Sequence, residues 1–266
     1  VYPSYEWHLG SAFRPPMGHA VFVFGAAGAG KTTFCRNLKE NGLPKRNIRL
    51  INLDPAQESG GDYDLDLCDF ITVKEIMNEC DYGPNGALFY ALREMCENID
   101  ELDLQDFEND YFVFDCPGQI ELFIHSDILQ TCVKHVKNFA KIAIVYLIDS
   151  TNFMNSSKLM YSLLCATISM YRFYLPVLNV VSKSDLLDEE KLGQIISGED
   201  IFESEFSDDE SGRLSRAIVE YVDSHGMLDF IPLDWKNEDM VESLLLCLDN
   251  ILQRYDDEEP REVKCD

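Results

Sequence analysis

The feature that most restricts the fold of this chain is the glycine-rich segment GAAGAGKT at residues 25–32, which matches the pattern G-x-x-x-x-G-K-[ST]. A short apolar run precedes it at residues 20–24, and a helix-like stretch follows at residues 31–40. Small residues in such a loop let successive backbone N–H groups point at phosphate oxygens, and the following helix adds its positive end. We therefore predict a phosphate-binding loop. A glycine turn that serves only close packing is the alternative.

Apolar runs recur along the chain and predict buried strands at residues 20–24, 48–53, 111–114, 142–148, 177–181 and 228–231. The runs do not alternate between apolar and polar residues, which is typical of strands that are covered on both faces. Helix-like stretches separate them, at residues 155–172, 187–196, 212–224 and 237–254. This order predicts an α/β fold: a doubly wound, mainly parallel sheet in a P-loop NTPase domain.

The rhythm is interrupted at about residues 56–110, which we interpret as a helical insertion with helices near 73–78 and 87–99. We expect residues 17–255 to form one domain that contains this insertion. Residues 1–16 form a leader without an apolar signal core. The leader is either an expression remnant, an incorrectly assigned start or a genuine extension. Residues 256–266 form a charged, acidic tail that we expect to be disordered.

Charge and cysteine content exclude several classes of protein. The chain has 48 acidic and 22 basic residues, a net charge of −26, which argues against a nucleic-acid or anionic-membrane surface. A protein partner with a basic face remains compatible. The nine cysteines show no C-x-x-C spacing, so we expect reduced, mostly buried thiols in a cytosolic or nuclear protein and no zinc site. No apolar run reaches membrane-spanning length.

The predicted strands are followed by a glycine at position 25 and by aspartates at positions 54, 115, 185 and 234. In parallel sheets of this kind, ligands bind beyond the carboxyl ends of the strands. In the phosphate loop, Lys31 is expected to reach the β- and γ-phosphates, and the Thr32 hydroxyl to bind Mg²⁺. These strand ends therefore predict one shared site.

The segment Ser182-Lys183-Ser184-Asp185 matches [NTS]-K-x-D after a buried strand. Asp185 can accept two hydrogen bonds from guanine, whereas adenine offers no such pair of donors. The Lys183 stem is expected to cover the base while its ammonium braces the phosphate loop. The pattern predicts GTP and GDP as ligands, and a surface turn is the alternative.

The segment Asp115-Cys116-Pro117-Gly118 matches D-x-x-G at a strand end. We expect Asp115 to hold Mg²⁺ through a water and the Gly118 N–H to contact the γ-phosphate. Gln119, Glu121 and Asp54 are candidates for orienting the attacking water, and the choice among them stays open. The alternatives are a solvated helix start for the first two and a cap or turn for Asp54.

These motifs, together with Asn52-Leu53-Asp54-Pro55-Ala56, Gly83-Pro84-Asn85-Gly86 and Gln119-Ile120-Glu121-Leu122, resemble the GPN-loop GTPase family. The resemblance runs in order from about residue 18 to 255 and is strongest to the eukaryotic second and third paralogues, with a leaning to the third. The chain departs from the family at Ala87, where a second glycine is usual, and in the leader.

The resemblance implies a dimeric GTPase switch, either a homodimer or a heterodimer with a paralogue. It implies that Asn85 of one subunit contacts the phosphate and attacking water of the other, with Glu121 and Asp54 as hydrolytic candidates. It also implies a role in assembly and nuclear import of RNA polymerase II, hence a cytoplasmic protein that shuttles to the nucleus. The residues assigned to the site are Gly25, Gly28, Ala29, Gly30, Lys31, Thr32, Thr33, Gly118, Lys183 and Asp185 for the nucleotide, Thr32 and Asp115 for Mg²⁺, and Asp54, Asn85, Gln119 and Glu121 for catalysis.

Two other functions compete with this interpretation. A nucleoside or polynucleotide kinase also carries a phosphate loop, but it needs cationic residues around the transferred phosphoryl group, and the chain has no Arg-rich lid. A nucleotide-binding interaction protein with little catalysis is the second alternative, and the complete catalytic motifs argue against it.

Overall fold

The computed structural model describes residues 18–42, 47–57, 62–99, 104, 110–197 and 210–253. The predicted leader at 1–16 and the predicted tail at 256–266 lie outside these ranges.

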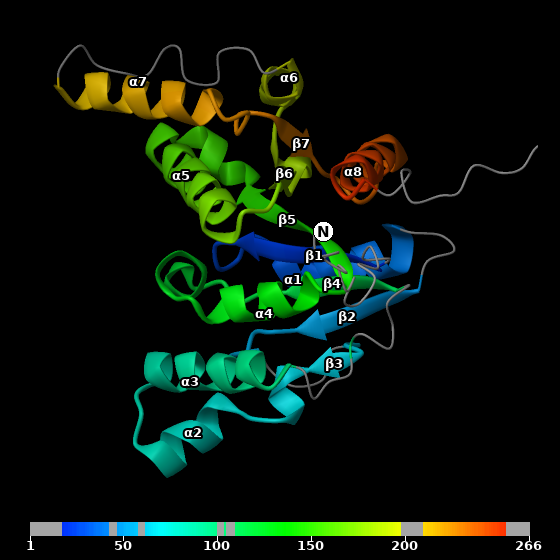
Figure 1. Cartoon of the computed structure of the whole chain (residues 1–266). Helices are drawn as coiled ribbons and strands as arrows, with labels where there is room; N and C mark the ends of the chain where they lie inside the picture. Colours follow the sequence, from blue (N-terminus) through cyan, green and yellow to red (C-terminus); the bar gives the residue numbers. More distant parts are fainter. Residues whose placement is uncertain are drawn as a thin grey trace, which may run out of the picture.

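The described strands form one sheet of seven parallel strands, as Figure 1 shows. They are β1 (Gly18–Gly25), β2 (Ile48–Asn52), β3 (Leu65–Asp66), β4 (Tyr111–Asp115), β5 (Ala140–Asp149), β6 (Val177–Ser182) and β7 (Phe230–Pro232). Their order in the sheet is β3-β2-β4-β1-β5-β6-β7, so the chain winds in both directions from β1. This confirms the predicted doubly wound α/β fold. The short strand β3 was not predicted, because two residues are too few to show a pattern of apolar and polar side chains.

Helices connect the strands and cover both faces of the sheet. They are α1 (Lys31–Asn37), α2 (Val73–Cys80), α3 (Pro84–Glu97), α4 (Ile128–Val136), α5 (Ser156–Phe173), α6 (Glu189–Ser197), α7 (Glu210–Asp223) and α8 (Glu238–Ile251). Shorter helical turns are η1 (Leu38–Gly42), η2 (Leu67–Asp69), η5 (Glu121–His125), η6 (Ser150–Met154) and η7 (Ser184–Leu186). None of the described helices has the length and apolar character needed to span a bilayer.

Strand β1 shows why its sequence is apolar at every position. Phe22 and Phe24 pack on the face covered by α3, α4 and α5. Val21 and Val23 pack on the opposite face, against α1 and α8. Successive side chains of a strand point to opposite faces, so a strand between two helical layers needs apolar residues throughout.

Helix α4 was not predicted, although its sequence contains a signal. Leu129, Cys132, Val133 and Val136 recur at helical spacing and are all buried. The Ser126 hydroxyl oxygen accepts a hydrogen bond from the Ile128 N–H (3.1 Å), as expected at a helix start.

The Gly-Pro-Asn segment also differs from the prediction of a turn followed by a helix near 87. Gly83 is the N-cap residue of α3, and Pro84 and Asn85 are its first helical residues. Proline suits this position because it has no N–H to leave unpaired and its φ is already helical. In Figure 1 the connection between α2 and α3 lies on the same side of the molecule as the arrowheads of β1 and β2.

Candidate active site

The phosphate loop connects β1 to α1 at the point where the sheet winds in both directions. Gly28 and Gly30 have φ values of 80° and 92°, a backbone conformation that favours glycine. Lys31 is only 8% exposed, and its ammonium donates a hydrogen bond to the Ala26 carbonyl oxygen (3.2 Å). The lysine is therefore folded into the loop, where phosphate oxygens would meet it.

The segment after β4 lies directly against this loop. A Cβ atom at Gly118 would be 2.9 Å from the Lys31 Nζ and 2.9 Å from the Ala27 Cα, so only glycine fits without movement. Together the two segments line a pocket of about 290 Å³. Its lining residues are Ala27, Gly28, Gly30, Lys31, Thr32, Thr33, Asp54, Asp115, Gly118 and Gln119.

Asp115 is 1% exposed at the end of β4. Burial raises the pKa of its carboxyl group, and hydrogen bonds from Tyr63 and Thr32 and the charge of Lys31 oppose that rise. Thr32 and Asp115 thus meet as two oxygen donors, which are the ligands that Mg²⁺ prefers. In the part of the chain that is described, no three His, Cys, Asp or Glu side chains gather as a metal site. Phosphate oxygens and waters would have to complete the coordination of a magnesium ion here.

Asp54 lies in the same pocket, just after β2. Its backbone N–H donates to the Oδ1 of the fully buried Asn52 (2.9 Å), and its own Oδ1 accepts from the Ala56 N–H (3.0 Å). The pKa of the Asp54 carboxyl is raised by burial and lowered to a lesser extent by the Ala56 N–H and Lys31. A carboxylate with a raised pKa can accept a proton more readily than an exposed one.

The other catalytic candidates are divided by the structure. Gln119 lines the pocket, and its Oε1 is buried without a hydrogen-bond partner. Glu121 is exposed at the start of η5 and is not among the residues that line the pocket. Asn85 is exposed on the first turn of α3 and does not line the pocket of its own chain.

The predicted base-reading segment lies beside the phosphate loop. Ser182 Oγ donates to the Ala29 carbonyl oxygen (2.7 Å), and Lys183 Nζ donates to the Gly28 carbonyl oxygen (2.9 Å) and to Asp149 Oδ2 (2.6 Å). Asp185 is exposed on η7. Neither Lys183 nor Asp185 lines the phosphate pocket, in keeping with a base site next to it.

Two residues of the site were missed in the sequence. Gln57 Nε2 donates to Thr32 Oγ1 (2.9 Å), and the Tyr63 hydroxyl lies 2.8 Å from Gln57 Oε1 and 2.8 Å from Asp115 Oδ2. Both belong to the predicted insertion and to no motif, so only their contacts show them.

Known proteins of similar sequence and similar fold exist for this chain. Residues 23–254 match a family described as "Conserved hypothetical ATP binding protein". The GPN-loop GTPase 3 of Debaryomyces hansenii is 36% identical over 258 residues, covering 91% of this chain and 94% of the relative. The proteins of the same name from Saccharomyces cerevisiae and Schizosaccharomyces pombe are 36% and 35% identical, covering 91% of this chain and 95% and 94% of the relatives.

The fold is also similar to the crystal structure of a GTPase in apo form from Pyrococcus abyssi. That match has a TM-score of 0.72 at 23% identity, and it covers 88% of this chain and 97% of the other. The description of the matching family mentions ATP, whereas the three relatives are named for GTP, the nucleotide that the pattern ending at Asp185 predicts.

Proposed function

Because this chain belongs to the GPN-loop GTPase family and is a GTP hydrolase, we propose that it works as a Mg²⁺-dependent dimeric switch that hydrolyses GTP to GDP and phosphate. The observation that carries the proposal is the single pocket that brings Lys31, Thr32, Asp115, Gly118 and Gln119 together at the carboxyl edge of the sheet.

Each group in the pocket has a chemical task. Lys31 neutralises charge on the β- and γ-phosphates, and the Gly118 N–H contacts the γ-phosphate. Thr32 and Asp115 would hold magnesium, which neutralises charge on the phosphate oxygens when it is bound. These groups act on the triphosphate mainly by positioning it and neutralising its charge, because phosphoryl transfer requires little covalent chemistry from the protein.

Water activation falls to Gln119 and Asp54, which also line the pocket. The Oε1 of Gln119 is a buried acceptor without a partner, so it can accept a hydrogen bond from an attacking water. Asp54 lies in the same pocket and can take the proton of that water. Glu121 is exposed outside the pocket and would have to turn inward to share this task.

The dimer supplies the remaining group. Asn85 lies outside the pocket of its own chain, in the first turn of α3. The connection from α2 to α3 lies on the side of the molecule where β1 and β2 end (Figure 1), which suits a residue that reaches a partner subunit. We infer that Asn85 completes the pocket of a second subunit. In a two-fold dimer each site then depends on both chains.

Mixing two inactive variants tests this arrangement. Asn85→Ala keeps its pocket but lacks the donated side chain, and Lys31→Ala keeps the donated side chain but lacks the pocket lysine. An equal mixture is expected to recover about a quarter of wild-type GTPase activity, because half of the dimers are mixed and one of their two sites is complete. As a matched control, Asn85→Ala mixed with the double variant Lys31→Ala/Asn85→Ala should stay inactive.

No recovery in the first mixture would place the action of Asn85 within its own chain. Full activity of Asn85→Ala alone would remove the residue from catalysis. Hydrolysis by the wild-type chain that requires an added paralogue would identify the working dimer as a heterodimer.

The cellular part of the proposal rests on the family resemblance. We propose that the protein assists assembly and nuclear import of RNA polymerase II from the cytoplasm, shuttling to the nucleus. Its net charge of −26 is compatible with holding basic protein clients. Depletion of the protein should leave polymerase subunits in the cytoplasm, and an unchanged nuclear distribution would contradict the role.

A further inference from the structure

Gln57 and Tyr63 join the two side chains that would hold magnesium. Gln57 Nε2 lies 2.9 Å from Thr32 Oγ1, and the Tyr63 hydroxyl lies 2.8 Å from both Gln57 Oε1 and Asp115 Oδ2. Thr32 and Asp115 both line the phosphate pocket. Gln57 and Tyr63 therefore connect these two pocket side chains through a continuous series of polar contacts.

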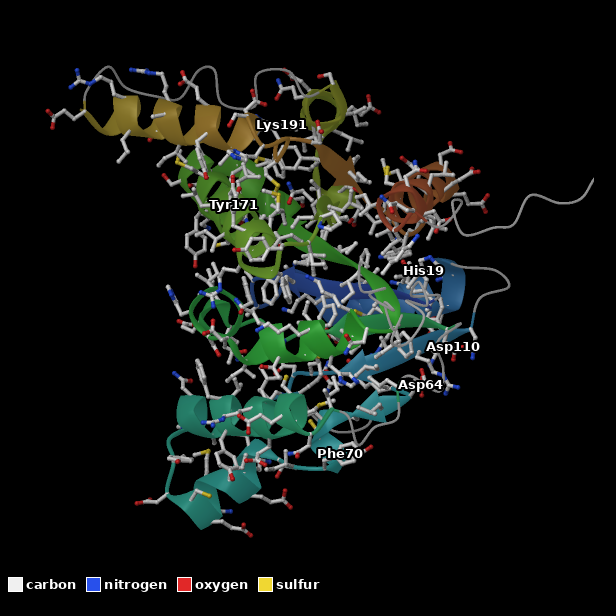
Figure 2. The ribbon with its side chains drawn as sticks, in the orientation of Figure 1. His19, Asp64, Phe70, Asp110, Tyr171 and Lys191 are labelled. Atoms are coloured by element: carbon white, nitrogen blue, oxygen red, sulfur yellow. The ribbon has the colours of Figure 1, made fainter. Side chains whose placement is uncertain are left out.

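Both added residues are held in place by their own backbone segments. The Gln57 N–H donates to the Asp54 carbonyl oxygen (3.2 Å), so the backbone of Gln57 is anchored next to the catalytic candidate. Asp64 follows Tyr63 in the chain and is labelled in Figure 2. Its carboxylate accepts hydrogen bonds from the Leu50 N–H (2.7 Å) and from Lys39 Nζ (2.8 Å), which fixes the segment beside Tyr63. The backbone next to each of the two side chains is thus tied to a neighbouring segment.

The position of Gln57 matters for a cation. Magnesium approaches its oxygen ligands to about 2.0–2.1 Å, and it favours near-octahedral geometry. The Gln57 amide group directs a hydrogen with partial positive charge at Thr32 Oγ1, the atom that the ion would bind. An amide hydrogen and a divalent cation repel each other when they share one small oxygen.

We propose that Gln57 competes with magnesium for the Thr32 hydroxyl and must leave it when the metal binds, and that Tyr63 holds Gln57 in the competing position. This inference rests on the magnesium site of the proposed function. It makes Gln57 a positioning residue that couples metal binding to the segment that follows Asp54.

Metal affinity measures this competition without reference to GTPase activity. The full-length protein saturated with GDP is titrated with Mn²⁺, free Mn²⁺ is followed by electron paramagnetic resonance, and Mg²⁺ affinity is obtained by displacement. Gln57→Ala is expected to bind Mg²⁺ about three- to tenfold more tightly, the effect of losing one hydrogen bond. Gln130→Ala serves as the control, because Gln130 Nε2 also makes a half-buried hydrogen bond (3.3 Å, to the Arg172 carbonyl oxygen) but lies on α4, outside the pocket lining.

An Mg²⁺ affinity for Gln57→Ala that equals or falls below that of the wild type would overturn the proposal. A lower affinity would mean that the glutamine assists the ion. Absence of metal uptake by the wild-type GDP complex would overturn the magnesium assignment itself, and this inference with it.

A double-mutant cycle tests the part played by Tyr63. Tyr63→Phe keeps the aromatic ring and removes the hydroxyl. The substitution therefore removes the contact with Gln57 Oε1 and also the contact with Asp115 Oδ2. In the Gln57→Ala background only the effect on Asp115 is left, so Tyr63→Phe should change Mg²⁺ affinity at least twofold less favourably there than in the wild type, where it also releases Gln57. Equal effects in both backgrounds would show that Tyr63 does not act through Gln57.

Discussion

The ammonium group of Lys183 donates a hydrogen bond to the carbonyl oxygen of Gly28 at 2.9 Å, which ties the segment after β6 to the phosphate loop. The same ammonium forms an ion pair with Asp149 at the end of β5 (2.6 Å). One side chain thus connects three segments that are far apart in the chain. Lys183 therefore connects the segment predicted to bind the base with the loop predicted to bind the phosphates.

Replacement of this ammonium should weaken nucleotide binding. Lys183→Met keeps an apolar stem of similar length but loses both charge-assisted contacts, so we expect GDP affinity to fall about tenfold. Calorimetric titration with GDP measures the change. Lys74→Met, at an exposed position on α2, is the matched control and should bind GDP as the wild type does. Unchanged affinity in Lys183→Met would show that the link does not support binding.

Asp185 should decide which base is bound. Asp185→Asn loses the acceptor pair for guanine, so GTP affinity should fall about a hundredfold while xanthosine triphosphate binds better. Competition between the two nucleotides measures the preference. Asp188→Asn is a suitable control, because the side chain of this exposed aspartate accepts the Lys191 N–H (2.8 Å) and asparagine can do the same. A preference for guanosine that survives in Asp185→Asn would refute the assignment.

Gly118 should tolerate no side chain. In Gly118→Ala the added Cβ would meet Lys31 Nζ and the Ala27 backbone at 2.9 Å, and the backbone atom cannot swing away. We expect at least a tenfold loss of GTP affinity, because the two segments that form the pocket have to move apart. Gly193→Ala on α6, where a Cβ meets nothing within 4 Å, should leave binding unchanged and stabilise the helix slightly. Wild-type binding by Gly118→Ala would mean that the two segments separate freely.

The ionisation of Asp54 should make stability depend on pH. Burial raises the pKa of its carboxyl group above the unfolded value, so the stability that this group contributes is fully present below the unfolded pKa and is lost as the pH rises through the folded pKa. Asp54→Asn stays neutral and keeps an oxygen for the Ala56 N–H. The nucleotide-free variant should therefore melt roughly 2–4 °C above the wild type at pH 7, the effect of about 1 kcal/mol.

Melting curves from pH 7 downward check this prediction. The difference between Asp54→Asn and the wild type should shrink as the wild-type carboxyl group becomes protonated. A difference that stays constant with pH, or a variant that is less stable at pH 7, would show that the charge of Asp54 is not the cause.

Much of the framework could be predicted because its signals are local. The phosphate loop at residues 25–32 depends on glycine at positive φ, and the strand that ends at Asp115 is an unbroken apolar run. Helix α4 could not be predicted from local signals alone. Its apolar residues have helical spacing, but the helix is short, and the π-helical turn just before it makes its first residue hard to recognise in the sequence. The start of α3 at Pro84 was missed for a similar reason, since Gly-Pro-Asn also suits a turn.

The sequence by itself determined the fold class, the phosphate loop and the strand ends that surround it, because each depends on residues that are neighbours along the chain. Only the tertiary structure decided that Gln119 enters the pocket while Glu121 stays exposed, and that Gln57 and Tyr63 meet Thr32 and Asp115. The direction of a loop side chain depends on how distant segments pack against one another. No local period or composition encodes that packing.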